Sequence, residues 1–448
     1  MPSAASPAPR PAPGPAPRPA PRPASTPAAH PALVLGGGIG GLAAALALHR
    51  RGFQVTVHER AASLEPVGAG LALAPNALRA LDALGVGARL RALAVRHPAV
   101  GLRRPSGRWL ARTDTDAVQR HFGDPVLAVA RAELIAALVD ALPPGTVRTN
   151  SPAALVAPGD ATAPALVDTP DGPAPASLVV AADGIRSATR GHLFPRHPGP
   201  HYSGFTTWRT VIDTPDRPPA AVGEIWGRGA LVGIVPLAAG RVYVYAAALA
   251  PAGRRAADGD EHAELLRRYG SWCAPLPELL RRTDPTRVLR HDVWELTDPL
   301  PAFHRGRVAL LGDAAHAMSP FQGQGACQAI EDAIVLAAAL PSRRPGSTPA
   351  DAPPSERPDP DPITAPPSER PDTDPITALP AYSTARLPRT SRIVAGSRTI
   401  GRLVAVRSRP GVLLRDTALT LAGRLPARFL LDRSAPTYTW QPPTATDR

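Results

Sequence analysis

Three short apolar runs in this chain each end in a turn built from glycine and aspartate. They are residues 32–35 before Gly36, residues 178–182 before Asp183-Gly184, and residues 308–311 before Gly312-Asp313. Short apolar runs bounded by turns are typical of strands in a buried parallel sheet. In a doubly wound sheet, ligands bind just beyond the carboxyl ends of the strands. The three turns therefore predict an α/β fold with one ligand site where several strands end.

The first turn carries the pattern G-x-G-x-x-G, followed by helix formers over 42–51 and by a second strand pattern over 53–59 that ends in Glu59. This βαβ arrangement predicts dinucleotide binding, because the glycines allow a tight turn, close approach of a pyrophosphate and close helix packing. The helix start offers N–H groups and a positive dipole end to the phosphates. The alternative is a glycine-rich loop that serves packing alone. The predicted phosphate-binding residues are Gly36, Gly38, Ile39, Gly40 and Gly41.

The two other turns continue into longer motifs. Asp183-Gly184 is followed by Ile-Arg-Ser, and residues 312–325 read Gly-Asp-Ala-Ala-His-Ala-Met-Ser-Pro-Phe-Gln-Gly-Gln-Gly before a predicted helix over 326–340. With the first turn, these runs resemble the three fingerprints of the class A flavoprotein monooxygenases. That family includes para-hydroxybenzoate, salicylate and urate hydroxylases and zeaxanthin epoxidase. The resemblance covers residues 31–340, with a fainter similarity over 382–398.

The resemblance implies a Rossmann-like FAD-binding domain of the glutathione-reductase type, an inserted and mainly antiparallel substrate sheet, and a C-terminal helical segment. It implies that the first turn holds the FAD pyrophosphate and that Glu59 binds the adenosine ribose. Arg131 is expected along the FAD and Asp313 at the ribitol hydroxyls. The remaining cofactor residues implied by the motifs are Asp183, Gly184, Gly312, Gly323, Gln324 and Gly325, the last three presenting N–H groups to the flavin ring.

The implied reaction uses NADPH or NADH to reduce FAD, and O2 then forms a flavin C4a-hydroperoxide. One oxygen atom passes to a small substrate, which is hydroxylated or epoxidised. Aromatic, polyketide and isoprenoid substrates stay open. An electron-rich ring calls for a base or cation beside it, and Arg209 is the first candidate, followed by Tyr243 and Tyr245. Pro320 is predicted to place its carbonyl near the reacting edge of the flavin.

Each of these residues also has a structural alternative. Asp313 could cap a helix, and Arg131 and Arg209 could be ordinary surface arginines. His316 resembles a structural residue of the family, and Arg186 and Arg190 could be solvated charges. For the whole protein, the alternatives are an FAD-dependent dehydrogenase or reductase without oxygen insertion, and a non-enzymatic arginine-rich binding protein.

Composition removes several classes of function. The chain contains no lysine, so a Walker lysine, a pyridoxal Schiff base and a lysine-dependent halogenation are excluded. The net charge of +13 comes from scattered arginines, and aromatic residues are only 4%, so a nucleic-acid partner is not expected. Two cysteines, Cys273 and Cys327, form no disulfide framework, which predicts a cytoplasmic protein. Neither a signal peptide nor a transmembrane helix is expected.

The sequence pattern divides the chain into segments. Residues 1–30 are a Pro/Ala/Arg tract predicted as disordered, and residues 342–378 are a predicted disordered insert with a 13-residue tandem repeat. The FAD-binding domain is expected at 31–105, 125–200 and 286–341. The substrate domain is expected at 106–124 and 201–285, with strands over 205–212, 223–226, 230–236 and 241–245. Residues 379–448 form a basic helical segment, which either packs on the FAD domain or makes a weak contact with an anionic membrane.

Overall fold

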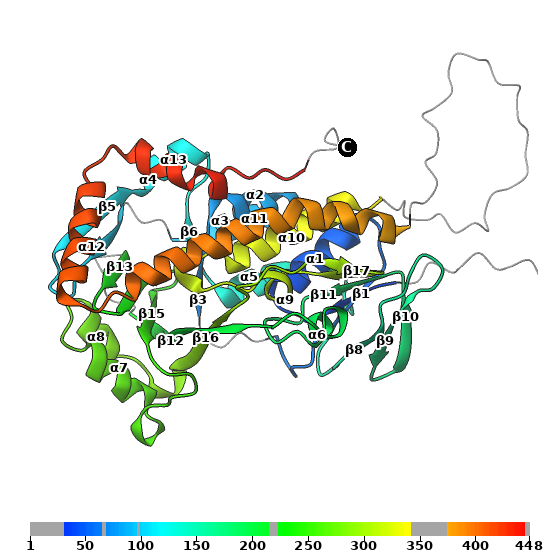
Figure 1. Cartoon of the computed structure of the whole chain (residues 1–448), viewed down its shortest axis with the longest axis horizontal. Coiled ribbons are helices and arrows are strands. Elements are labelled where there is room, and N and C mark those ends of the chain that lie inside the picture. The colour runs from blue at the N-terminus through cyan, green and yellow to red at the C-terminus, as the bar shows by residue number, and fades with distance from the viewer. Residues whose placement is uncertain (1–30, 65–68, 96–98, 215–222, 342–373, 444–448) are drawn as a thin grey trace, which may run out of the picture.

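The computed structural model describes residues 31–64, 69–95, 99–214, 223–341 and 374–443 (Figure 1). Within these ranges the chain forms a six-stranded sheet at one end of the long axis and a seven-stranded sheet toward the other, together with two smaller sheets. The tract 1–30 and most of the repeat-containing insert, residues 342–373, lie outside the described residues, as do residues 444–448.

The six-stranded sheet brings the three motif turns together. Its order is β17-β18-β11-β1-β2-β7, and all neighbours are parallel except β17 and β18. The central strands are short, apolar and fully buried, as expected for a parallel sheet covered on both faces. Since β18, β11 and β1 are neighbours, their carboxyl ends meet at one edge. The strands are β1 (Ala32–Leu35), β2 (Val55–His58), β7 (Val147–Arg148), β11 (Leu178–Ala181), β17 (His304–Arg305) and β18 (Val308–Leu310).

Helices and a small sheet enclose this core. Helix α1 packs against α10 and α5, and the three-stranded sheet β10-β9-β8 adds Ala165, Val167 and Ala176 to the same apolar cluster. The bounds are α1 (Ile39–Arg50), α2 (Pro75–Ala83), α3 (Gly87–Leu93), α5 (Arg131–Asp140), α6 (Ala188–Leu193), α9 (Asp313–His316), α10 (Gly325–Ala339), β3 (Gly70–Leu73), β6 (Leu127–Ala130), β8 (Ala154–Ala157), β9 (Ala165–Thr169) and β10 (Gly172–Ala176).

The seven-stranded sheet has the order β16-β12-β15-β14-β13-β4-β5, in which only β13 and β4 are parallel. Successive side chains alternate between its two faces. One face packs its apolar residues against α7 and α8, so the opposite face is left for the site. The bounds are β4 (Ala99–Arg103), β5 (Trp109–Asp114), β12 (His201–Asp213), β13 (Gly223–Trp226), β14 (Ala230–Leu237), β15 (Arg241–Leu249), β16 (Leu289–Glu295), α7 (Glu261–Tyr269) and α8 (Leu276–Arg281).

Two predicted domain boundaries are wrong. Strand β4 was expected in the FAD-binding segment 31–105 and β16 in the segment 286–341, yet both lie in the seven-stranded sheet. Strand β4 pairs with β13, and β16 pairs with β12. A short strand pattern predicts that a strand forms but not which sheet it joins, because pairing partners lie far away in the sequence.

The C-terminal segment consists of three helices. The 30-residue α11 (Pro375–Val404) runs beside α10 along the molecule, and α12 (Arg409–Ala422) and α13 (Ala427–Tyr438) lie at the end away from the six-stranded sheet (Figure 1). Helix α11 begins inside the predicted insert, because Asp374 accepts a hydrogen bond from Ile376 N and Pro375 occupies the first helical position. None of the helices in the described ranges is long and apolar enough to cross a bilayer. Helix α4 (Thr115–Phe122) packs on α13.

Candidate active site

The first turn can be formed only by glycines at two of its positions. Gly36 has φ +106°, and a Cβ there would lie 2.4 Å from the carbonyl oxygen of Ala182. A Cβ on Gly41 would lie 2.0 Å from the Gly36 oxygen, whereas a Cβ on Gly38 would meet nothing within 4 Å. Gly36 and Gly41 therefore hold the turn closed, and Gly38 faces open space where a ligand can approach.

Glu59 lies at the mouth of this turn. Its Oε2 accepts a hydrogen bond from Gly37 N at 2.7 Å, and its Oε1 accepts one from Ala61 N at 2.8 Å. No side chain caps the start of α1. The first N–H groups of this helix therefore remain available to an anion.

The second and third turns are clamped together by Arg190. This buried guanidinium donates to Ile185 O at 2.7 Å and to Ala314 O at 3.1 Å, so it is a structural bridge and not a solvated charge. Asp183 accepts from Thr189 N through Oδ2, while its Oδ1 is buried without a partner in the described structure. Arg186 is exposed. The turns thus present one unsatisfied carboxylate oxygen at the edge where the strands end.

Asp313 occupies the first position of α9 but does not cap it, since Gly312 is the capping residue and makes no side-chain bond. Its carboxylate has no hydrogen-bond partner among the described residues, although the side chain is accessible. The surrounding protein raises the pKa of Asp313 by desolvation, and the positive charges of His316, Arg131 and Arg209 oppose this rise. A ligand hydroxyl can therefore reach this carboxylate.

Four elements bring their polar groups to this place. Burial lowers the pKa of Arg131, which begins α5, and the Asp313 charge opposes that shift. Burial raises the pKa of Tyr243 on β15, opposed by Arg209 on β12 and by Arg131. The Tyr243 ring lies against Gly70, where a Cβ would be only 2.7 Å from the ring. Arg131, Arg209, Tyr243 and Asp313 therefore share one electrostatic environment.

Aromatic side chains cover the face of the seven-stranded sheet next to this group, which we call the sheet floor. Strand register sets Arg209 opposite Tyr245, and Val211 opposite Tyr243, so the predicted Arg209, Tyr243 and Tyr245 all lie on one face. The two tyrosine rings are 5.5 Å apart between centroids. In the same register Gly233 lies between Tyr245 and Glu224, and a Cβ on it would lie 2.0 Å from Tyr245 Cζ. Because Gly233 has no side chain, the Tyr245 side chain can extend across β14 to Glu224.

Glu224 receives two hydrogen bonds on this floor. The Tyr245 hydroxyl donates to its Oε1, and Trp226 Nε1 donates to its Oε2, each at 2.7 Å. Burial raises the pKa of Glu224, and these hydrogen bonds only partly oppose the rise. No cation is paired with this carboxyl among the described residues. Glu224 could not be predicted from the sequence, because its position across β14 from Tyr245 follows from register alone.

A loop from the third motif approaches the sheet. The 3-10 turn η3 (Pro320–Gln322) contains the exposed Pro320, and Phe321 packs edge-on against Phe205 with ring centroids 4.9 Å apart. Gly323 has φ +63° and no neighbour within 4 Å of an added Cβ. Helix α10 starts at Gly325 without a side-chain cap, so its first N–H groups are available to a ligand.

Comparison with known proteins identifies the family. A family model described as "FAD binding domain" matches residues 29–349. The chain belongs to this family. The aurachin C monooxygenase/isomerase of Stigmatella aurantiaca is 35% identical over 318 residues, covering 69% of this chain and 80% of that protein. The 3-amino-4-hydroxybenzoate 2-monooxygenase of Streptomyces platensis is 33% identical over 413 residues, covering 88% and 93%.

The fold of this FAD-binding protein also matches a solved flavoenzyme. Klebsiella pneumoniae HpxO, complexed with FAD and uric acid, superposes with a TM-score of 0.76 at 25% identity, over 91% of this chain and 96% of HpxO. The predicted resemblance to the class A flavoprotein monooxygenases is confirmed, and the chain is an FAD-dependent monooxygenase. The mixed α/β architecture is confirmed with it.

The residues of the site suit FAD. The open space at Gly38 suits a pyrophosphate, and the unpartnered Asp183 Oδ1 and Asp313 carboxylate suit donors of a ligand. Gln324 Nε2, also buried without a partner in the described structure, suits an acceptor beside the start of α10. These are groups that a folded protein leaves unsatisfied only where a ligand or water completes them.

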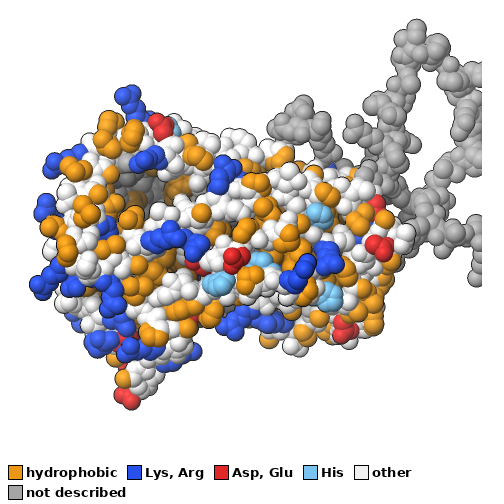
Figure 2. All heavy atoms as spheres, viewed as in Figure 1, with side chains coloured by type: hydrophobic (Ala, Val, Ile, Leu, Met, Phe, Trp, Pro, Cys, Tyr) orange, Lys and Arg blue, Asp and Glu red, His pale blue; other side chains and the backbone are white. Residues whose placement is uncertain are grey.

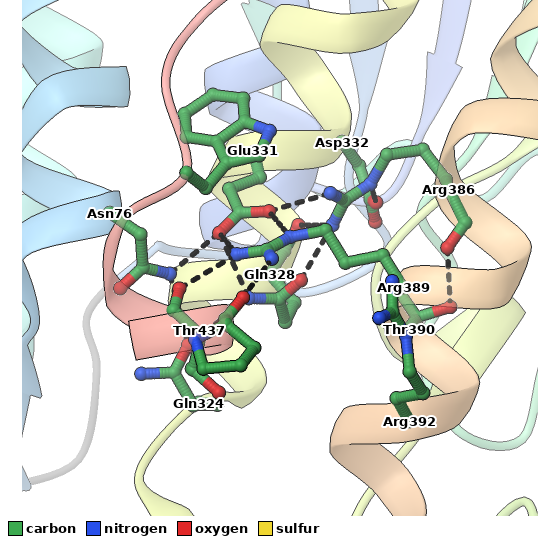
Figure 3. Close-up of polar contacts among 12 residues, drawn as sticks. Asn76, Gln324, Gln328, Glu331, Asp332, Arg386, Arg389, Thr390, Arg392 and Thr437 are labelled. Carbon is green, nitrogen blue, oxygen red and sulfur yellow. Dashed lines mark hydrogen bonds and ion pairs between the residues drawn. The ribbon is translucent and has the colours of Figure 1, made fainter. Parts of the chain in front are cut away.

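Behind the loop of residues 320–324 lies a buried ionic network that could not be predicted from the sequence (Figure 3). Arg386 of α11 donates through Nη1 to Glu331 and through Nε to Asp332, both at 2.6 Å. Asp332 Oδ2 in turn accepts from Gly312 N at 2.9 Å and from His316 Nε2 at 2.6 Å. His316 is therefore structural, as the resemblance implies. The available signal was the Glu-Asp pair inside the apolar pattern of 326–340.

The network also reaches the loop of residues 320–324. Asn76 donates to Glu331 Oε1 at 2.6 Å and to Gln324 Oε1 at 3.0 Å (Figure 3). Cys327, next to this loop, is buried, and burial raises the pKa of its thiol to about 12, as expected for a small core residue. The turn at Gly312 and the loop that ends at Gln324 are thus both held by residues of α10 and α11.

Proposed function

We propose that this monooxygenase uses NADPH or NADH and O2 to place one oxygen atom on a hydroxylated aromatic or heteroaromatic substrate. When bound, FAD supplies the transfer of electrons from the nicotinamide to O2 and of one oxygen atom to the substrate. The other oxygen atom leaves as water, so each turnover consumes one nicotinamide and one proton. The residues of this chain bind, orient and protect the reactants.

One observation carries this proposal, which is the convergence of Arg131, Arg209, Tyr243 and Asp313. They come from α5, β12, β15 and α9, yet each influences the ionisation of at least one other. Arg131, Tyr243 and Asp313 each have a shifted pKa, and perturbed titratable groups from separate elements are typical of active sites. Arg131 and Asp313 are residues expected to contact FAD, and Arg209 and Tyr243 lie on the sheet floor. The reacting parts of the cofactor and the substrate would therefore meet here.

The cofactor is proposed to lie across the three strand ends. The first turn and Glu59 would bind the pyrophosphate and the adenosine ribose, and Asp313 the ribitol. N–H groups at the start of α10 favour negative charge on a reduced flavin, because a helix N-terminus stabilises anions. The proposed FAD-binding residues are Gly36, Gly38, Ile39, Gly40, Gly41, Glu59, Arg131, Asp183, Gly184, Gly312, Asp313, Gly323, Gln324 and Gly325.

The substrate ring is proposed to lie on Tyr243 and Tyr245, below Pro320. Arg209 on the same face favours the deprotonated form of a substrate hydroxyl, which makes the ring more electron-rich. Glu224 can accept a hydrogen bond from a substrate N–H or O–H group. The relatives support this class, since one acts on an aminohydroxybenzoate and HpxO is complexed with uric acid. Both compounds are rings that carry hydrogen-bond donors.

Purification and turnover test the proposal. We expect a yellow protein whose NAD(P)H and O2 consumption is stimulated by hydroxylated aromatic acids or hydroxyquinolones, with product mass increased by one oxygen from labelled O2. Arg209→Gln should lower turnover and shift its pH profile upward, since the substrate hydroxyl loses its counter-charge. Arg254→Gln, an exposed arginine after β15, is the control. A reduced or oxidised product without added oxygen would instead establish the dehydrogenase or reductase alternative.

A further inference from the structure

Helix α12 packs against the protein in an inverted manner. Its charged residues Arg415 and Asp416 are buried, while Leu413 and Leu414 are 62% and 73% exposed. Arg415 donates to Asp416 and to Gly227 O at 3.1 Å, and Arg104 forms an ion pair with Asp416 at 2.7 Å. A surface helix ordinarily turns its apolar side inward. Leu413 and Leu414 are therefore directed to an environment other than the protein core, whereas Leu419 of the same helix packs on it.

Most of the exposed large apolar residues lie in one stretch of the chain. Apart from three valines elsewhere, those in the described part of the chain are leucines and a phenylalanine between residues 403 and 429, on the end of α11, on α12, in the link after it and at the start of α13. Clusters of this kind mark interaction sites, whereas single exposed apolar residues are ordinary. We call this set the α12–α13 patch, and it consists of Leu403, Leu413, Leu414, Leu421, Leu425 and Phe429.

Positive charge surrounds the patch. Within the described residues from 402 to 433, the one exposed acid is Asp432, and Asp416 is buried against arginines. Figure 2 shows arginine and apolar side chains intermixed at the end of the molecule where α12 and α13 lie. The exposed arginines are Arg402, Arg407, Arg409, Arg424, Arg428 and Arg433.

We propose that the α12–α13 patch docks this enzyme on the surface of an anionic membrane. Exposed leucines and a phenylalanine can enter the boundary between headgroups and acyl chains, while arginines bind lipid phosphates. A second copy of this chain suits the patch less well. A two-fold interface would set the same arginines against one another, with only Asp432 to compensate them.

Vesicle flotation of the full FAD-loaded protein tests the proposal. We expect binding to vesicles of phosphatidylcholine with phosphatidylglycerol, weakened by salt, and much weaker binding to phosphatidylcholine alone. Replacing both Leu413→Gln and Leu414→Gln should lower the partition coefficient at least about tenfold. Removing charge with Arg424→Gln and Arg428→Gln should lower it about fivefold per arginine.

Matched substitutions elsewhere on the surface serve as controls. Val156→Gln removes another exposed apolar side chain, and Arg254→Gln with Arg255→Gln removes two exposed arginines, so neither should alter binding. Flavin absorbance and circular dichroism check that each variant is folded. Two results overturn the proposal: vesicle binding that survives the patch substitutions, or a dimer in light scattering that the leucine substitutions dissociate without any vesicle binding.

Discussion

The proposed cofactor end and the proposed substrate end of the site each hold a desolvated carboxylate, but they surround it differently. Asp332 behind the cofactor turns faces Arg386 and His316 and accepts the Gly312 N–H. Burial acts to raise its pKa, yet these charges and hydrogen bonds lower it to about 2. Glu224 on the sheet floor has only the neutral donors Tyr245 and Trp226, and its pKa is raised.

This difference distinguishes a carboxylate that supports the fold from a carboxylate that can bind a ligand. A fully compensated buried charge holds the elements around it in fixed positions, because removing either partner exposes the other to an unfavourable environment. A desolvated carboxyl without a cation is destabilising in the free protein and gains from any ligand that donates a hydrogen bond. We therefore propose that Asp332 supports the turns that would bind FAD and that Glu224 takes part in recognising the substrate.

The largest expected effect comes from removing an arginine that neutralises the buried carboxylates at the cofactor end. Arg386→Met leaves Asp332 buried without its arginine and leaves Glu331 with Arg389 alone, so the free energy of unfolding should fall by about 4 kcal/mol. FAD retention should fall too, since Asp332 holds Gly312 and His316. Urea unfolding and flavin content measure the two effects. Arg392→Met, an exposed arginine of the same helix, should change neither.

A small loss of stability on Arg386→Met would contradict this assignment. It would mean that Glu331 and Asp332 are compensated in another way, for example by protonation or by Arg389, which also bonds Glu331. Repeating the unfolding measurement with Arg389→Met in the same background separates these explanations, because only the second predicts a large additional loss.

The next effect concerns the first turn. Gly41→Ala forces a Cβ against the Gly36 oxygen, so stability should fall by about 3 kcal/mol and FAD should be lost. Gly38→Ala meets no protein atom, so the stability of the FAD-free protein should stay unchanged while FAD affinity falls. Thermal unfolding of the FAD-free protein and flavin titration distinguish the two. Equal FAD affinity in Gly38→Ala and the parent would show that the pyrophosphate lies elsewhere.

The sequence could predict those features whose residues lie close together along the chain. The first turn is local: its glycines, the helix start and Glu59 lie within 24 residues, so spacing alone carries the geometry. The strands 223–226 and 230–236 were predicted nearly as observed, because alternation and turns are local signals as well. The turn at 238–240 that joins β14 to β15 is also a local feature, since Ala239 and Gly240 both adopt positive φ.

Features that depend on distant pairing were not predictable in this way. Glu224 meets Tyr245 only through the register of three strands, and Arg386 meets Asp332 only because α11 lies along α10. Strands β4 and β16 were assigned to the wrong domain for the same reason. The inverted packing of α12 was hidden too, because a mixture of arginine and leucine in the sequence does not tell which side is buried.

The pH dependence of stability should separate the two carboxylates. The folded pKa of Asp332 is below its unfolded value of about 4, so its contribution of about 2 kcal/mol is present above pH 4 and is lost as the pH falls toward 2. Glu224 has a raised folded pKa. Its contribution is therefore present below its unfolded pKa of about 4 and is lost as the pH rises through the folded value.

Urea unfolding across this pH range measures both contributions. Asp332→Asn should destabilise the protein most at neutral pH and least at pH near 2. Glu224→Gln should gain stability relative to the parent as the pH rises above about 4, which is the opposite trend. If the two difference curves ran parallel, the proposed contrast between scaffold and binding carboxylate would be wrong.

The smallest expected effect tests the substrate end alone. Gly233→Ala places a Cβ 2.0 Å from Tyr245 Cζ, so the ring must move and its hydroxyl must leave Glu224. The KM for the aromatic substrate should rise about tenfold, a cost of about 1.4 kcal/mol, with FAD content unchanged. Gly191→Ala, where an added Cβ meets nothing, is the control. Should Gly233→Ala misfold, Tyr245→Phe removes only the hydroxyl. A loss of FAD with an unchanged KM in that variant would place Tyr245 on the cofactor side and remove the distinction between the two ends.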